Sequence, residues 1–181
     1  MKVKVQMRYA NPSILMDVIF GRASLRWAKR NGTIQTAAEV GVQAGINAKS
    51  MLRVIKPVRM VCADPYEGYS TELGMFYDQI ERIAHRRLKR FKQVEWVKSG
   101  DQQVIADAIG RETMDYLYID AAHDCASVSK DMRAYWPCVK KGGVLAGHDI
   151  VWPSVFRAIA NFQYEYNVDI YCSGTDWWIK K

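Results

Sequence analysis

The 181-residue sequence has no apolar run of the about 18 residues that a membrane span needs, and no closely spaced pair of cysteines. Its four cysteines lie far apart, which disfavours a zinc knuckle and fits free thiols in a reducing compartment. Residues 1–8 scatter charges among apolar residues and contain no apolar core of a secretory signal. We therefore expect a soluble, cytoplasmic protein with no membrane association.

Histidine is also scarce, whereas positive charge is not. The net charge is +7, and one short stretch carries six Lys or Arg residues: Arg82, Arg86, Arg87, Lys89, Arg90 and Lys92. Such a stretch can bind phosphate or nucleic acid. It is equally typical of the solvated face of an amphipathic helix that packs on a sheet. We favour the helix and keep the nucleic-acid interpretation open.

The apolar pattern alternates between short runs typical of strands and longer runs typical of helices. Strands are predicted at 37–41, 58–63, 93–98, 115–120 and 143–148. Helices are predicted at 13–30 with Ser13 as N-cap, 46–55, 74–91, 101–110, 125–136 and 153–163. Residues 168–179 form two further strands joined at Ser173-Gly174.

Five strand-then-helix units in succession predict an α/β fold. We expect a Rossmann-like, doubly wound and mostly parallel sheet, with helices on both faces and a C-terminal antiparallel hairpin strand. The chain is then a single domain, 1–181, with an N-terminal helical extension (1–32) and a core (33–181). Trp177 and Trp178 follow one another in the last strand, so we expect one of them to be exposed, at an acceptor pocket or a subunit contact.

A glycine turn follows the first predicted strand. Glu39 lies near the end of the strand, and Gly41 and Gly45 come before the next helix. Glycine at these positions removes the side chain that would block a nucleotide-like group. The second strand ends about 20 residues further on in Asp64, where an acid suits the hydroxyls of a ribose. The two features together predict a nucleoside ligand.

The carboxyl ends of parallel strands meet at one edge of a sheet, where ligands bind. Five places follow the predicted strands: Gly41, Asp64, 99–101, 120–124 and 148–149. Four of the five carry a carboxylate and the other carries the glycine turn, which predicts one shared crevice.

These segments resemble the motifs of class I S-adenosylmethionine-dependent methyltransferases. Residues 39–45 (EVGVQAG) resemble the E/D-x-G-x-x-x-G motif, and Ser99-Gly100-Asp101 resembles the segment that borders the adenine. Residues 118–123 with 141–149 are similar to the I-D-G-x-H and P-G-G-x-x-x-G-H-D pattern. That pattern marks small O-methyltransferase-like domains found with sugar and natural-product tailoring enzymes.

The resemblance covers roughly residues 37–165 and departs from the pattern twice. Ala121-Ala122 replaces a glycine and an acid, and Lys140-Lys141 replaces a common proline. It implies S-adenosyl-L-methionine as cofactor and O-methylation of a small hydroxylated, sugar-like or natural-product-like acceptor. The implied cofactor-binding residues are Glu39, Gly41, Gly45, Asp64, Ser99, Asp101 and Asp120. The alternative roles are a cap of loop amides for Glu39 and the N-cap of the following helix for Asp101.

Asp120 and Asp149 end neighbouring strands, and we expect them to share Mg²⁺ or a similar hard cation. Such an ion lowers the pKa of a bound hydroxyl. Ile150 replaces the Asn of catechol-type relatives, so a third ligand must come from His123, Asp124 or His148. We expect His148 to act as general base, with Asp120 and His123 assisting it, because histidine exchanges protons near neutral pH. Histidines that only hold a loop are the alternative.

Two other functions remain open. A nucleic-acid methyltransferase would explain the positive charge, although the sequence has no N-P-P-Y or D-P-P-Y segment. A non-catalytic subunit that binds S-adenosylmethionine is the second alternative, since the chain leaves little material for a cap over the acceptor. A homodimer would supply that missing wall, with Trp152 as a further wall of the acceptor site.

Overall fold

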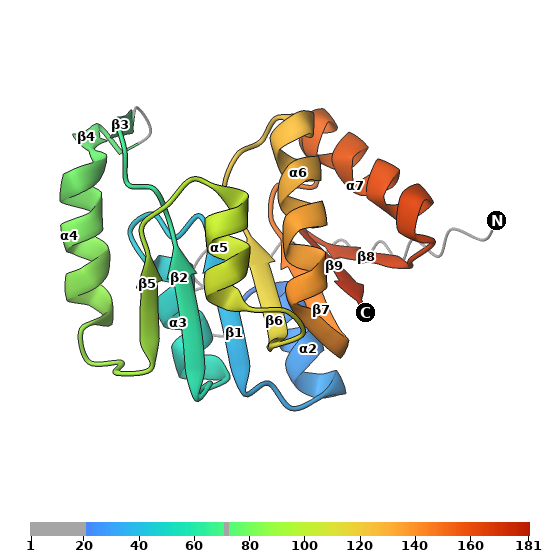
Figure 1. Cartoon of the computed structure of the whole chain (residues 1–181), viewed down its shortest axis with the longest axis horizontal. Helices are drawn as coiled ribbons and strands as arrows, with labels where there is room; N and C mark the ends of the chain where they lie inside the picture. Colours follow the sequence, from blue (N-terminus) through green and yellow to red (C-terminus); the bar gives the residue numbers. More distant parts are fainter. Residues whose placement is uncertain (1–20, 71–72) are drawn as a thin grey trace.

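The computed structural model describes residues 21–70 and 73–181 (Figure 1). The strands are β1 (Thr36–Val40), β2 (Arg59–Ala63), β3 (Tyr69–Ser70), β4 (Met75–Phe76), β5 (Val94–Val97), β6 (Met114–Ile119), β7 (Val139–Gly147), β8 (Ile170–Ser173) and β9 (Asp176–Lys180). The helices are α2 (Ala23–Asn31), α3 (Ile46–Val54), α4 (Tyr77–Leu88), α5 (Gln102–Ile109), α6 (Cys125–Tyr135), the short 3₁₀ helix η1 (Trp136–Cys138) and α7 (Pro153–Tyr166).

Seven of these strands form one sheet in the order β5-β2-β1-β6-β7-β9-β8. The first five are parallel, β9 runs antiparallel to β7, and β8 pairs antiparallel with β9. The predicted Rossmann-like fold is therefore confirmed, including the C-terminal hairpin. The chain moves outward from β1 to β5 and then returns to β6 on the other side of β1. Ligands in such sheets bind at this reversal, beyond the carboxyl ends of the strands.

Each face of the sheet carries its own core. Helices α5, α6 and α7 lie on one face and α2 and α3 on the other (Figure 1). Alternate strand residues face opposite ways, so Leu117 packs with the first group and Tyr118 with the second. The expectation that Trp177 or Trp178 would be exposed is wrong: they are 1% and 5% exposed. They do point to opposite faces, but both faces are covered.

Several boundaries differ from the predictions: α4 ends at Leu88 and not at 91, α7 ends at Tyr166 and not at 163, and the starts of α4 and β7 are shifted. A helix over 74–91 was expected, yet α4 begins at Tyr77, because residues 75–76 pair with 69–70 as a two-stranded hairpin. The strand expected at 143–148 is the longer β7, which begins at Val139. Lys140 lies inside it because its ammonium pairs with Asp115 on the adjacent β6 at 2.8 Å.

Helix α2 overlaps the N-terminal helix expected at 13–30, but it begins only at Ala23 and ends one residue beyond the prediction. Gly21 has φ +81° and Arg22 is the N-cap with ψ 158°, so these two residues are not helical. Ser13, expected to begin that helix, lies outside the described residues. Within the described part of the chain, no helix has both the length and the apolar character that crossing a membrane requires.

Candidate active site

Close packing and backbone conformation both restrict which residues fit the glycine turn after β1. Gly41 has φ +86° and donates its N–H to the carbonyl of Ala63 at 2.9 Å. A β-carbon on Gly41 would overlap the backbone carbonyl of Asp120, so this turn touches the strand end that carries Asp120. Gly45 has φ +72° but has ordinary space around it. The close contact with the Asp120 backbone therefore requires glycine at position 41. At position 45 it is the positive φ that favours glycine.

Asp64 joins the first two strand-end loops. Its carboxylate accepts the backbone N–H of Gln43 at 2.8 Å and of Tyr66 at 2.9 Å. The Tyr66 hydroxyl returns a hydrogen bond to the Gln43 carbonyl at 3.0 Å. Burial raises the pKa of Asp64, although these amide hydrogen bonds oppose the rise. The acid predicted to bind a ribose thus also fixes the shape of the loops around it.

Glu39 is 1% exposed, in the middle of the sheet edge. Its Oε1 accepts a hydrogen bond from Asn47 of α3 at 2.8 Å. Its Oε2 has no hydrogen-bond partner among the described residues. Burial raises the pKa of Glu39 to about 8. The Glu39 carboxyl group is therefore buried with one of its two oxygens hydrogen-bonded, and it does not cap loop amides.

Ser99 and Asp101 follow β5. Asp101 is the N-cap of α5 and accepts the backbone N–H groups of Gln103 at 2.8 Å and Val104 at 3.1 Å. The Ser99 hydroxyl oxygen accepts the Asp101 N–H at 3.0 Å. The helix-capping alternative is thus present in the structure, and a contact with adenine stays a prediction for both residues.

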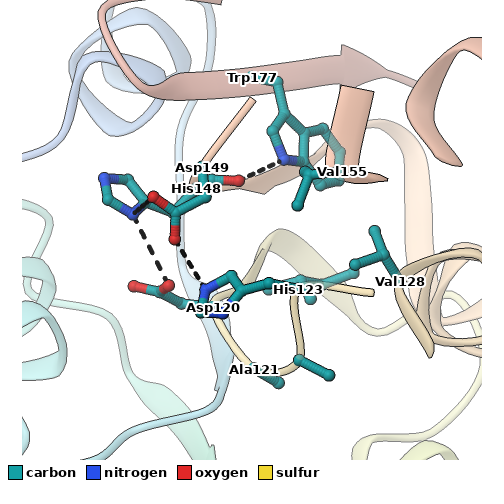
Figure 2. Close-up of a pocket in the computed structure, with 10 residues that line it drawn as sticks. Asp120, Ala121, His123, Val128, His148, Asp149, Val155 and Trp177 are labelled. Atoms are coloured by element: carbon teal, nitrogen blue, oxygen red, sulfur yellow. Dashed lines mark hydrogen bonds and ion pairs between the residues drawn. The ribbon is translucent and has the colours of Figure 1, made fainter. Parts of the chain in front are cut away.

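The loops after β6 and β7 bring two acids and two histidines together (Figure 2). Asp149 lies between two imidazoles: His123 Nε2 is 2.8 Å from Oδ2, and His148 Nδ1 is 3.0 Å from Oδ1. His148 Nδ1 is also 3.8 Å from Asp120 Oδ1. These side chains line one pocket, whose apolar walls include Ile119, Val128, Val155 and Trp177. The predicted crevice therefore has its most polar part here.

Asp120 and Asp149 respond differently to this environment. Burial raises the pKa of Asp120, although the charges of His148 and Arg22 oppose the rise. Burial also acts upward on the pKa of Asp149, but hydrogen bonds and charge from His148 and His123 outweigh it and lower the pKa. One carboxylate is thus held ionised while its neighbour takes up a proton more readily.

Ligand atoms of Asp120, His123 and Asp149 all lie within 4.8 Å of one another. This geometry favours one of the three residues, His123, Asp124 and His148, that were considered as the third metal ligand. Asp124 instead caps α6 by accepting the Ser127 N–H at 2.9 Å. His148 places its Nε2 2.7 Å from the Thr175 hydroxyl. His123 is the residue that completes the candidate metal site.

Two residues beside the cluster lie outside every motif. Thr175, in the turn before β9, contacts His148, and Trp177 Nε1 donates to the His148 carbonyl at 3.1 Å. Arg22 lies on the opposite side, with its guanidinium 3.6 Å from Asp120 Oδ2. Sequence reasoning missed Thr175 and Arg22 because neither follows a parallel strand, which was the feature that located the other residues.

The solvent side of the cluster is apolar. Trp152 stacks on the His123 ring with 5.1 Å between centroids, and it is 51% exposed. Val151 and Phe156 nearby in sequence are also exposed. His123 therefore lies between the acids and an exposed aromatic side chain.

A family described as a methyltransferase domain matches residues 38–150, which contain the glycine turn, Asp64 and the whole acid and histidine cluster. The chain belongs to this methyltransferase family. The enzyme is a class I methyltransferase with S-adenosylmethionine as its cofactor, as the motifs predict. Arg22 and Thr175 lie outside the matched region.

Solved structures share the fold of this methyltransferase at low sequence identity. An O-methyltransferase from Bacillus cereus, solved in complex with SAH, is 14% identical with TM-score 0.63, covering 94% of this chain and 83% of its own. A methyltransferase from Geobacter sulfurreducens is 19% identical with TM-score 0.60, covering 90% and 79%. CalS11, a TDP-rhamnose 3′-O-methyltransferase of calicheamicin biosynthesis, is 14% identical with TM-score 0.63, covering 92% and 79%. No curated protein matches the sequence.

Proposed function

We propose that this enzyme transfers the methyl group of S-adenosylmethionine to a hydroxyl oxygen of a small acceptor at the Asp120, His123 and Asp149 cluster. The observation that carries the proposal is that these ligand atoms lie within 4.8 Å of one another, while Asp120 is in contact with the glycine turn at Gly41. Donor turn and acceptor cluster are therefore adjacent. Methyl transfer is an in-line displacement, for which such positioning is the main requirement.

The donor half consists of the residues predicted for cofactor binding. The turn from Gly41 to Gly45 lies along the methionine end, Asp64 faces the ribose hydroxyls, and Ser99 with Asp101 borders the adenine. Glu39 supports this arrangement, because a buried carboxylate with one unpartnered oxygen suits the donor's ammonium group. Asp120 adjoins the same methionine end.

The acceptor half suits a divalent cation. Two carboxylates and one imidazole are a donor set that Mg²⁺ or a similar ion accepts, and Asp120, His123 and Asp149 would hold it. When bound, the ion would lower the pKa of an acceptor hydroxyl and orient its oxygen.

His148 is the proposed general base, with Thr175 as its partner. Nδ1 lies 3.0 Å from the Asp149 carboxylate, which only accepts hydrogen bonds, so Nδ1 carries a hydrogen. Nε2, 2.7 Å from the Thr175 hydroxyl, is then the nitrogen that takes up a proton.

In the proposed reaction an acceptor oxygen forms a bond to the methyl carbon while the bond from that carbon to the sulfonium sulfur breaks. The electron pair of that bond returns to sulfur, which leaves S-adenosylhomocysteine. The hydroxyl proton moves to His148 Nε2.

An acceptor with a ring and neighbouring hydroxyls fits the surroundings of the cluster. Trp152 offers an exposed ring face beside His123, and ring-shaped molecules such as sugars and aromatic natural products stack on such faces. CalS11, which shares the fold, is a TDP-rhamnose 3′-O-methyltransferase.

A nucleic-acid substrate is less well supported. The second half of helix α4 packs beside Gly45 of the glycine turn. Arg87 donates a hydrogen bond to the Ala44 carbonyl in that turn, and Arg82 is paired with Asp78 at 3.1 Å. These two basic residues are therefore engaged within the chain.

The test is methyl transfer from labelled S-adenosylmethionine to a panel of sugar, catechol and polyketide acceptors, with Mg²⁺ or with EDTA. We expect transfer that EDTA suppresses, and a raised melting temperature with S-adenosylmethionine or S-adenosylhomocysteine. No thermal shift with either ligand, with or without Mg²⁺, would contradict the proposal.

A further inference from the structure

We propose that Arg22 binds the carboxylate at the methionine end of the donor, opposite Glu39, which takes the ammonium group. The inference rests on the proposed function and assigns a role to a residue outside the matched region 38–150. It makes the segment before α2 part of the cofactor site.

Arg22 lies at the end of the sheet where β6 and β9 carry acids. Its guanidinium is 3.6 Å from Asp120 Oδ2 and 3.9 Å from Asp176 Oδ1. It also lies over the ring of Tyr118, 5.9 Å from the centroid. The side chain is 20% exposed. Arg22 thus brings a positive charge to the crevice from the side opposite to the Asp149 loop.

A buried polar network fixes this segment. Asp176 is 2% exposed and accepts the Ser24 backbone N–H at 3.1 Å and the Ser24 hydroxyl at 2.8 Å, both on Oδ2. Its Oδ1 accepts the Tyr118 hydroxyl at 2.9 Å. The first turn of α2 is thereby attached to β6 and β9, since Ser24 and Tyr118 supply neutral donors to both carboxylate oxygens. Because Arg22 directly precedes this turn as the N-cap of α2, the attachment also fixes its position.

Glu39 supplies the complementary charge. Its unpartnered Oε2 is buried, and a buried carboxylate oxygen is costly until a donor reaches it. The charge of Arg22 opposes the rise that burial causes in the pKa of Glu39, so the guanidinium acts electrostatically on this carboxyl group. An incoming ammonium group satisfies Glu39 and removes that cost.

The two charges together recognise a zwitterion in one orientation. An α-amino acid with its ammonium toward Glu39 and its carboxylate toward Arg22 pairs each group with the opposite charge. The reverse orientation places like charges together, which disfavours it. Arginine suits this role because its planar guanidinium binds a carboxylate through two N–H donors.

The simpler role for Arg22 is to neutralise Asp120 and Asp176. In that role its removal affects the protein equally whatever ligand is bound. A ligand that lacks only the carboxylate therefore separates the two roles.

The experiment measures binding of three ligands by calorimetry: S-adenosylhomocysteine, its decarboxylated analogue and 5′-methylthioadenosine, which lacks the whole amino-acid end. The proteins are the wild type, Arg22→Gln, Arg22→Lys and, as matched control, Arg30→Ala at an exposed position of α2. We expect Arg22→Gln to weaken S-adenosylhomocysteine about 10- to 100-fold and the other two ligands less than about 2-fold. Arg22→Lys should recover part of the affinity, and Arg30→Ala should change nothing.

The wild type gives an independent measurement if Arg22→Gln fails to fold. Decarboxylation of the ligand must then cost the wild type about 10-fold or more. Equal weakening of all three ligands by Arg22→Gln, or equal wild-type affinity for S-adenosylhomocysteine and its decarboxylated analogue, would overturn the role of Arg22. If the wild type binds none of the three ligands, the proposed function itself fails.

Discussion

The two halves of the candidate site are built differently. The donor half is centred on two buried acids, since Glu39 in β1 is 1% exposed and Asp64 after β2 is 5% exposed. The acceptor half presents its side chains to solvent, since 43% of the His123 side chain is exposed and Trp152 beside it is more exposed still. Backbone geometry shapes the first half, and side chains shape the second.

This difference separates the expected effects of mutation. Changes in the donor half alter stability and cofactor binding together, because its acids are part of the core. Changes in the acceptor half alter turnover or acceptor binding and leave the fold intact.

The largest effect is expected from Gly41→Ala. A β-carbon there overlaps the Asp120 carbonyl, which is backbone and cannot rotate away, and φ is +86°. We expect a loss of about 2–4 kcal/mol in the free energy of unfolding and loss of S-adenosylhomocysteine binding. Urea denaturation and calorimetry measure the two effects.

Gly142→Ala is the matched control for this prediction. Gly142 has φ +82° but nothing within 4 Å of the added carbon. It should cost only about 1–2 kcal/mol, the cost of the left-handed backbone. Equal losses for the two variants would show that contact with Asp120 is unimportant.

Asp149→Asn should act on turnover alone. Loss of this carboxylate removes a candidate metal ligand and the partner of two histidines, so we expect kcat to fall about 100-fold or more. Affinity for S-adenosylhomocysteine should stay within about 3-fold, because the donor half is unchanged. Asp169→Asn, at an exposed position, is the control. A parallel loss of donor affinity would contradict the separation into halves.

Glu39→Gln should change the pH dependence of stability in the ligand-free protein. The pKa of Glu39 is raised from 4.5 to about 8, so the folded state binds this proton more tightly than the unfolded state. The resulting stability is fully present below pH 4.5 and is lost as the pH rises through about 8. The variant should lack this decline, which has a slope of at most about 1.4 kcal/mol per pH unit.

Urea denaturation at pH values from about 5 to about 8.5 measures that slope, because this range lies above the ordinary pKa of Glu39 and includes its raised pKa of about 8. Glu165→Gln serves as control, because Glu165 is exposed and its hydrogen bond with Arg133 lowers its pKa. The same slope in the wild type and in Glu39→Gln would show that Glu39 does not titrate in this range.

Trp152→Ala should raise the KM for the acceptor about 10-fold with little change in stability. The indole is half exposed and stacks on His123, so its removal takes away an aromatic surface without opening the core. Tyr164→Ala, 85% exposed on α7, which begins directly after Trp152, is the matched control. Steady-state kinetics decide: an unchanged acceptor KM would exclude Trp152 from the acceptor site.

The smallest effect is expected at the basic end of α4. Arg86→Glu combined with Arg90→Glu should change transfer to a small acceptor less than about 2-fold, because both side chains are exposed and neither belongs to the acid and histidine cluster. A gel shift with RNA and DNA at two salt concentrations accompanies the assay. Salt-sensitive binding that the double variant abolishes would favour a nucleic-acid substrate.

The residues that the sequence located share one property. Glu39, Asp64, Asp120 and Asp149 lie at or after the ends of buried parallel strands, where apolar pattern and topology together determine position. Arg22 and Thr175 enter the site through long-range contacts at the two ends of the chain. No local pattern encodes such contacts.

The structural errors have the same origin. The hairpin of β3 and β4 has two residues per strand, too short for any periodicity to show. The sequence around Lys140 is typical of a turn, but in the structure Lys140 belongs to β7 and forms an ion pair with Asp115 on the adjacent strand. Burial of both Trp177 and Trp178 depends on α2 and α7 covering opposite faces of the same hairpin, which the sequence of the hairpin cannot indicate.

The short outer strands of the sheet bear on how two copies of this chain can associate. Its two edges are β5 and β8, each four residues long. Edges this short offer few free backbone groups for strand pairing, which protects a sheet from end-to-end growth. A dimer that completed the acceptor site would therefore have to join through helices or loops, and the exposed Val151, Trp152 and Phe156 would lie within such a contact.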